Sequence, residues 1–286
     1  MASGANNGLL KHNPRMVDFD NARDITIFGT HLRNAAGFHV AFRRGSGLTI
    51  WGVTLDTPYT VKNSDGIDPM GSSDITIANS FIRTGDDNIA IKADAGRPSS
   101  HISIVNSHLY WGHGLSIGSG TYPAVTAVLV RDVTLDGTRL AAIRIKSGAS
   151  NGGVVSGIVY DHVCIRNSER PIQIETGYSD ADDPRNDRIP VFKNILLKDV
   201  VISGGGKILI AGHDALHPTD IRLSNVVLAD GPANYLFSAS FAHVQLGPGP
   251  VNFALSGNGV EVDGRPDRGA NAQCAEAFVP FPTTGS

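Results

Sequence analysis

One eight-residue pattern recurs along the chain, with apolar residues at its first, third and eighth positions and polar or small residues between most of them. Alternation with a period of two is typical of a strand that buries one face. Successive copies begin 23, 27, 27, 26, 30, 37 and 26 residues apart. Such a period is near the length of a solenoid coil, and the longer intervals leave room for inserted loops. The eight copies begin at Ile25, Leu48, Ile75, Ile102, Val128, Ile158, Ile195 and Ile221.

A second, shorter strand pattern lies between these copies. It reads GIDPM, NIAIKA, GLSIG, AIRIKS and PIQIET, starting at Gly66, Asn88, Gly114, Ala142 and Pro171. Two or more strands per coil, with Gly, Asn, Asp and Ser at the bends, predict an all-β fold, a right-handed, single-stranded parallel β-helix with one long core. A leucine-rich repeat is the competing solenoid, but its fixed Asn and L-x-x-L-x-L pattern are missing. We expect one domain over residues 1–286, with coils from about 20 to 262 and a C-terminal tail over 263–286.

Aligning the second strand by its first inward apolar residue brings polar residues together. Asp65, Asp87 and His113 each stand two places before that residue. Equivalent positions of neighbouring coils lie about 4.8 Å apart, the ordinary spacing of strands. The sequence therefore predicts a short column of these three side chains, with Asp86 beside it.

Two cations extend this column. Arg144 and Lys146 stand one and three places after the alignment point of a later coil, where we expect them to face outward. Clustered carboxylates push at least one pKa upward, while nearby cations pull in the other direction. Split pKa values suit an acid and a base, as in the two-carboxyl mechanism of glycoside hydrolysis. An Arg and a Lys together suit the carboxylate of a sugar acid.

Each of these groups has a simpler interpretation. Asp65, in NSDG, is of a type that hydrogen-bonds local backbone at a bend. Asp86 and Asp87, in TGDDN, could form a solvated turn or a Ca²⁺ site, and His113 could be a turn histidine. The two cations could be an ordinary exposed strand face. Their joint placement on one face of consecutive coils favours the functional interpretation.

Composition narrows the ligand classes. With 24 basic and 27 acidic residues the net charge is −3, so we expect neither nucleic acid nor a membrane as partner, and we expect a monomer. No apolar stretch approaches the ~20 residues that span a bilayer. Cys164 and Cys274 are too few for a disulfide framework, and whether they pair is open. The first residues lack the features of a secretory signal.

Four motifs occur in order: NSDGIDP at 63–69, TGDDNIAIK at 84–92, GHGLSIGS at 112–119 and IRIKSG at 143–148. The chain resembles the polygalacturonases, the pectin-degrading glycoside hydrolase family 28, from about residue 13 to the segment that begins at Cys274. Ser64 departs from the Thr that is usual in the first motif. The resemblance implies hydrolysis of α-1,4 bonds between galacturonate units of a pectic polysaccharide or oligogalacturonate, by inversion, with no metal or organic cofactor.

The resemblance also implies roles for single residues. Asp86 resembles the general acid, Asp65 and Asp87 the pair that activates water, and His113 the histidine that supports the protonation of the acid. The candidate substrate-binding residues are Arg144, Lys146, Tyr178 and Asn63, and for Asn63 we favour a local hydrogen bond. Carboxylates one coil apart look closer than the ~6.5–9.5 Å usual for inverting enzymes, so the stereochemistry rests on the resemblance.

Other interpretations remain on the same fold: a pectate lyase with Ca²⁺ and an Arg base, a rhamnogalacturonan or xylogalacturonan hydrolase, and a non-catalytic carbohydrate-binding β-helix. The family suggests an extracellular or periplasmic location. Only 62 residues precede Asn63, fewer than the family usually has, so we expect N-terminal coils and their cap to be missing. The inserts at 93–100 and 175–192 are candidate walls of the cleft, and the sequence does not distinguish endo from exo action.

Overall fold

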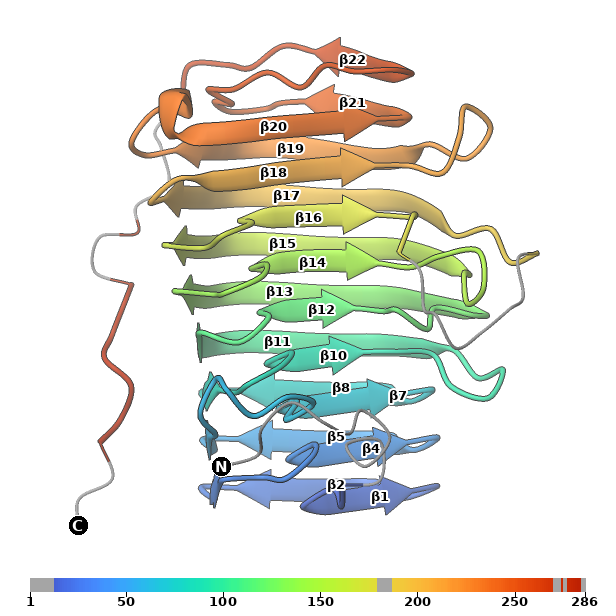
Figure 1. Cartoon of the computed structure of the whole chain (residues 1–286), viewed down its shortest axis with the longest axis vertical. Coiled ribbons are helices and arrows are strands. Elements are labelled where there is room, and N and C mark those ends of the chain that lie inside the picture. The colour runs from blue at the N-terminus through green and yellow to red at the C-terminus, as the bar shows by residue number, and fades with distance from the viewer. Residues whose placement is uncertain (1–12, 179–186, 270–273, 275–276, 284–286) are drawn as a thin grey trace.

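The computed structural model describes residues 13–178, 187–269, 274 and 277–283. Parallel strands lie one coil above the next, from the blue N-terminal coils to the red C-terminal ones (Figure 1). Among the described residues the one helical element is the 3₁₀ turn η1 (Pro232–Asn234). No helix in the described part of the chain is long and apolar enough to cross a membrane. The predicted parallel β-helix is confirmed.

One face of the solenoid is a nine-stranded parallel sheet, called here the site sheet, built from the short second strands of the coils. In spatial order its strands are β1 (Val17–Asp20), β4 (Val40–Arg43), β7 (Ile67–Met70), β10 (Ile89–Ile91), β12 (Leu115–Ile117), β14 (Ile143–Lys146), β16 (Ile172–Glu175), β18 (Gly206–Ala211) and β20 (Tyr235–Ser240).

The opposite sheet, called here the long sheet, contains thirteen strands, and three of them form a short side branch. Its main path is β2 (Arg23–Phe28), β5 (Ser46–Trp51), β8 (Ser73–Ala78), β11 (Ser99–Tyr110), β13 (Ala124–Asp136), β15 (Val154–Arg166), β17 (Val191–Ser203), β19 (Thr219–Leu228), β21 (Ala242–Leu246) and β22 (Val260–Gly264). The side branch is β3 (His31–Arg33), β6 (Thr54–Asp56) and β9 (Phe81–Arg83), and it joins β11.

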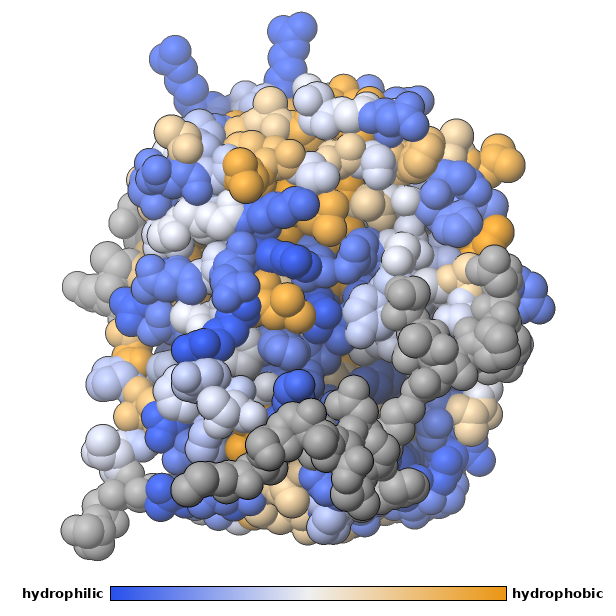
Figure 2. Space-filling view, in the orientation of Figure 1, coloured by the Kyte–Doolittle hydropathy of each residue, from blue (hydrophilic) through white to orange (hydrophobic). Residues whose placement is uncertain are grey.

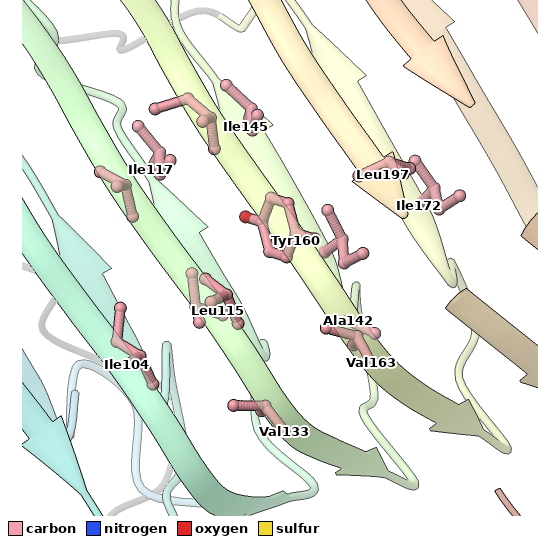
Figure 3. Close-up of a cluster of buried hydrophobic side chains, with 14 of the residues drawn as sticks. Ile104, Leu115, Ile117, Val133, Ala142, Ile145, Tyr160, Val163, Ile172 and Leu197 are labelled. Atoms are coloured by element: carbon pink, nitrogen blue, oxygen red, sulfur yellow. The ribbon is translucent and has the colours of Figure 1, made fainter. Parts of the chain in front are cut away.

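The register predicted from the repeat is confirmed in both sheets. In the site sheet the alignment residues pair in sequence: Ile67, Ile89, Leu115, Ile143 and Ile172. The first residues of all eight long copies pair down the other sheet. Their side chains are buried in one continuous core, part of which is drawn in Figure 3, except that Ile25 of the first copy is partly buried against it. Full burial of an aliphatic side chain contributes roughly 1.5–3 kcal/mol, so the stacked core is the main force that holds coil on coil.

The eight-residue pattern contains a bend that the alternation did not predict. Its fifth residue has a left-handed backbone in every copy, with φ of 57° at Gly29, 53° at Asn79, 55° at Asp132 and 54° at His162, for example. Gly, Asn and Asp adopt this conformation at little cost. The bend turns the chain, so the eighth residue of the pattern enters the core from a different side. The strand predicted for each copy is present but bent, and in the first three copies it is divided into two short strands.

The C-terminal segment returns to the body of the solenoid. Cys274 forms a disulfide with Cys164 on β15, across 110 residues of sequence, which answers the open question of their pairing. The Tyr110 hydroxyl donates a hydrogen bond to the carbonyl of Val279 at 2.8 Å. The Arg83 guanidinium lies 3.9 Å from the centre of the Phe281 ring. In Figure 1 this segment runs down one side of the coils.

Candidate active site

The predicted site lies on three stacked turns that precede β7, β10 and β12. The Gly66 amide donates to the carbonyl of Asp87 at 2.9 Å, and the His113 amide donates to that of Asp86 at 2.9 Å. Gly85 permits this close stacking, since a Cβ there would overlap the carbonyl of Val61. The fold thereby brings the predicted residues of consecutive coils to one place.

Asp86 and His113 form the most direct contact of the site. The His113 Nδ1 atom lies 2.8 Å from Asp86 Oδ1, and the amides of Asn63 and Asp87 also donate to this carboxylate. Burial raises the pKa of Asp86, but the hydrogen bond and charge of His113, helped by Lys146, outweigh burial and bring it to about 2. The Nδ1 atom of His113 must then carry the proton that the two groups share. In the free protein Asp86 is therefore the ionised partner.

Asp87 accepts hydrogen bonds from three side chains. They come from Ser116 Oγ at 2.7 Å, Arg144 Nη1 at 3.2 Å and Lys146 Nζ at 3.1 Å. Arg144 and Lys146 are only 5% and 7% exposed, so they are not the open strand face that their outward register suggested. Both cations face away from the core as predicted, but in the free protein their partner is Asp87.

Asp65 belongs to a buried group that the sequence interpretation missed. Lys92 Nζ lies 2.5 Å from Asp68 Oδ2 and 3.4 Å from Asp65 Oδ2. Burial raises the pKa of Asp65 well above its usual value, the Asp68 charge adds to this, and Lys92 opposes it. Burial likewise raises the pKa of Asp68, against the charge of Lys92. A hydrogen bond with Asp65 also acts to lower the pKa of Asp68.

Asp68 and Lys92 both lie within the motifs that carried the family resemblance. Asp68 stands one place after the alignment residue of its coil, the position that Arg144 has on β14. Lys92 stands three places after the alignment residue of its coil, the position that Lys146 has on β14. The same alignment would have found them if each column had been searched for charge. The carboxylates of Asp65 and Asp87 and the cations Lys92, Arg144 and Lys146 are therefore neighbours on one face of the solenoid.

The remaining predicted residues lie at the edge of this group. The Tyr178 ring centre is 5.3 Å from Lys146 Nζ and 5.8 Å from the Arg144 guanidinium. Asn63 contacts Asp86 of the next coil through its backbone amide, at 3.2 Å. Of the insert at 175–192, residues 179–186 lie outside the described residues. Residues 94–97 form a tight turn, Arg97 lines a separate groove with Arg23 and Arg44, and none of residues 93–100 lines the cleft beside Asp86.

A cleft of about 970 Å³ opens beside Asp86 and His113. Hydrophilic residues gather over the middle of the face that carries the site sheet (Figure 2). The lining residues are Asn13, Arg15, Gly37, Phe38, Tyr59, Thr60, Lys62, Asn63, Gly85, Asp86 and His113.

Ligand atoms of Asp86, Asp87 and His113 lie within 4.8 Å of one another, which is close enough to hold a metal ion. Calcium, however, favours a shell of oxygen ligands. Here one of the three possible ligand atoms is the nitrogen of His113, and the side chains of Arg144 and Lys146 already pair with Asp87. The donor set suits proton transfer better than Ca²⁺.

The sequence model of the glycosyl hydrolases family 28 matches residues 1–243. The chain belongs to this family. Family 28 membership agrees with the four motifs, and those motifs hold the catalytic candidates described above.

Two curated relatives show the same relationship. This family 28 chain is 36% identical over 330 residues to a polygalacturonase of Ralstonia solanacearum, with 96% of this chain and 61% of the relative covered. It is 40% identical over 230 residues to an endo-polygalacturonase of Pectobacterium carotovorum subsp. carotovorum, with 80% and 56% covered. The chain thus spans about three-fifths of the length of these relatives.

The solved structure of a polygalacturonase from Erwinia carotovora ssp. carotovora has the same fold. It aligns with a TM-score of 0.75 at 38% identity, and the alignment covers 81% of this chain and 60% of that one. The solenoid of this family 28 chain is therefore that of a solved polygalacturonase over most of its described length.

Proposed function

We propose that the chain hydrolyses α-1,4-glycosidic bonds between galacturonate units of pectin by an inverting acid and base mechanism. The observation that carries this proposal is the convergence of three carboxyl groups, one histidine and two cations on one face of consecutive coils, namely Asp65, Asp86, Asp87, His113, Arg144 and Lys146. In the free protein the pKa of Asp65 is raised and that of Asp86 is lowered, so the proposed roles of base and acid require substrate binding to change the protonation of both groups. The relatives that are named polygalacturonases support a pectic substrate.

Protonation of the leaving oxygen is assigned to Asp86, with His113 as its source of protons. In the free protein the shared proton is on His113 Nδ1, 2.8 Å from Asp86 Oδ1. A bound uronate brings a like charge close to Asp86 and excludes water, and both effects raise a carboxyl pKa. The step requires His113 to start as an imidazolium: its Nδ1 proton passes to the Asp86 carboxylate and leaves a neutral imidazole, and Asp86 then donates the proton to the glycosidic oxygen as the bond from that oxygen to the anomeric carbon breaks.

Activation of water is assigned to Asp65 together with Asp87. A base with a raised pKa is a stronger proton acceptor once it is ionised, which favours general base catalysis near its pKa. The three donors on Asp87 hold that carboxylate in one orientation. Inversion is part of the proposal and is supported by the family resemblance.

Arg144, Lys146 and Tyr178 are proposed to bind the uronate. Both cations lie on β14, and their distances to the ring of Tyr178 allow one ligand to contact all three. A substrate carboxylate would share the donors that Asp87 now uses, and Arg can hold it with two parallel hydrogen bonds. This exchange would couple substrate binding to the position of Asp87.

The Cys164–Cys274 disulfide is consistent with a location outside the cytoplasm, because disulfides persist in oxidising compartments. We therefore propose an extracellular or periplasmic enzyme that acts as a monomer without a cofactor.

The direct test is incubation with polygalacturonate. The folded wild-type chain should release reducing ends, and Asp86→Asn should not. Ultraviolet absorbance of unsaturated products, lost on adding a chelator, would instead indicate a lyase. Absence of reducing ends from folded wild-type protein would refute the proposal.

A further inference from the structure

The cleft beside Asp86 contains a cation that the catalytic group does not use. Lys62 lines this cleft together with Asn63, Asp86 and His113. Its side chain is exposed and makes no hydrogen bond or ion pair with any residue that the structure describes. By contrast, Lys92, Arg144 and Lys146 are each paired with an aspartate.

The loop that carries Lys62 is tied to the loop that carries Asp86. The amide of Asn63, the residue after Lys62, donates to Asp86 Oδ2 at 3.2 Å. The Ser64 hydroxyl bonds to the carbonyl of Val61 and accepts a hydrogen bond from the Gly85 amide at 2.9 Å. The backbone at Lys62 is thus held next to the proposed acid by contacts on both sides.

Lys62 and the β14 cations lie on opposite sides of Asp86 along the solenoid axis. Lys62 precedes β7, Asp86 precedes β10, and Arg144 lies two strands further along on β14. A polymer that lies along the site sheet with its scissile bond at Asp86 would therefore present one unit to β14 and another to Lys62.

Two further side chains bound the same part of the cleft. The Arg15 guanidinium lies 5.4 Å from the Phe38 ring centre and pairs with Asp18 at 3.0 Å. Tyr59 is exposed on the cleft, and the guanidinium of Arg139 lies 3.6 Å from the centre of its ring. Cations beside exposed rings suit a sugar acid, which has a carboxylate and a ring with apolar C–H groups.

We infer that Lys62 forms a second uronate-binding subsite on the N-terminal side of Asp86, with Arg15 and Tyr59 at its edge. This inference rests on the proposed hydrolysis of galacturonate polymers and specifies which substrate units it requires. A chain with free carboxylates on both sides of the scissile bond would be held at Lys62 and at Arg144 together. Methyl esters would weaken the hold at both places.

The test compares wild type, Lys62→Gln and Lys62→Arg on polygalacturonate at low ionic strength. An exposed charged contact accounts for up to about fivefold in affinity, so Lys62→Gln should raise KM roughly fivefold and leave kcat nearly unchanged. Lys62→Arg should keep most of the affinity. The matched control is Lys193→Gln, because Lys193 is an exposed lysine of β17 on the other sheet.

Two conditions should narrow the difference in KM between wild type and Lys62→Gln. Added salt screens exposed charges, and a highly methyl-esterified polymer has few carboxylate charges for Lys62 to bind. An unchanged KM in Lys62→Gln would overturn the subsite, and so would a lower kcat at unchanged KM, which would indicate a role in placing the loop. If wild type neither binds trigalacturonate nor releases reducing ends, the proposed function fails and the subsite fails with it.

Discussion

The Nδ1 atom of His113 lies 2.8 Å from the Oδ1 atom of Asp86, and this contact sets the resting charge of the proposed acid. Burial alone would raise the pKa of Asp86, and the histidine reverses that effect. The proposed general acid is therefore ionised before substrate binds. In the proposed mechanism a protonated His113 supplies its proton.

Removal of the histidine tests this assignment. In His113→Ala, burial is no longer opposed by the hydrogen bond, so the pKa of Asp86 should rise from about 2. Carboxyl carbon chemical shifts followed against pH would report the change. The kcat should fall roughly 10²-fold, within the range for loss of one acid–base group. A pKa of Asp86 that stays at about 2 in the variant would show that His113 is not its cause.

Asp65→Asn should abolish activity and yet stabilise the folded protein. The raised pKa of Asp65 means that the folded chain binds a proton that the unfolded chain has released, so wild-type stability declines as pH rises above about 4. Asparagine removes this decline. The Tm advantage of the variant should therefore grow from pH 4 towards neutrality, as followed by thermal unfolding at several pH values.

The outcome that would contradict this account is a Tm difference that is constant with pH or that shrinks as pH rises. Asp136→Asn offers a control, because Asp136 is also paired, with Arg166 at 2.6 Å, but lies on the long sheet away from the proposed site.

Lys92→Met should destabilise the fold strongly. The lysine lies between two buried carboxyl groups, and removing one partner of a buried ion pair costs about 3–5 kcal/mol. Urea unfolding at pH 7 would measure the loss. The second substitution Asp68→Asn, which removes the orphaned charge, should restore part of the stability. Simple additivity of the two changes in a double-mutant cycle would contradict a direct pair between Lys92 and Asp68.

The disulfide should contribute to stability without being needed for catalysis. Cys164 and Cys274 close a loop of 110 residues, and loss of such a cross-link costs about 2–5 kcal/mol. Cys164→Ser and Cys274→Ser should each lower Tm by several degrees and retain activity well below that Tm. Loss of activity in a variant that is shown by circular dichroism to be folded would give the C-terminal segment a role at the site.

The fold could be predicted to the level of register because the information is local and repeated. Ile67, Ile89 and Leu115 occupy the same place in three coils, and stacking equivalent apolar residues is the only way to bury them all. The bend at the fifth residue of the long pattern was missed because apolar spacing does not report the sign of φ. Asn79 and Asn106 carried that signal in their residue type.

Most residues of the candidate site could be predicted, but which of them contact one another could be predicted less well. Alignment places Asp65, Asp87 and His113 near one another, but it gives no side-chain distances, so the contact of Asp87 with Arg144 and Lys146 was not foreseen. Asp68 and Lys92 were not among the predicted site residues. The return of the C-terminal segment to Cys164 depends on a contact across 110 residues, which no local pattern encodes.

The most direct measurement of the central claim is proton NMR of the products while folded wild-type protein acts on oligogalacturonate. Hydrolysis with inversion at an α-linkage predicts that new reducing ends appear first as the β-anomer, and that Asp86→Asn and Asp65→Asn release none. Initial release of the α-anomer, formation of unsaturated ends, or release of reducing ends by either variant at the wild-type rate would contradict the account.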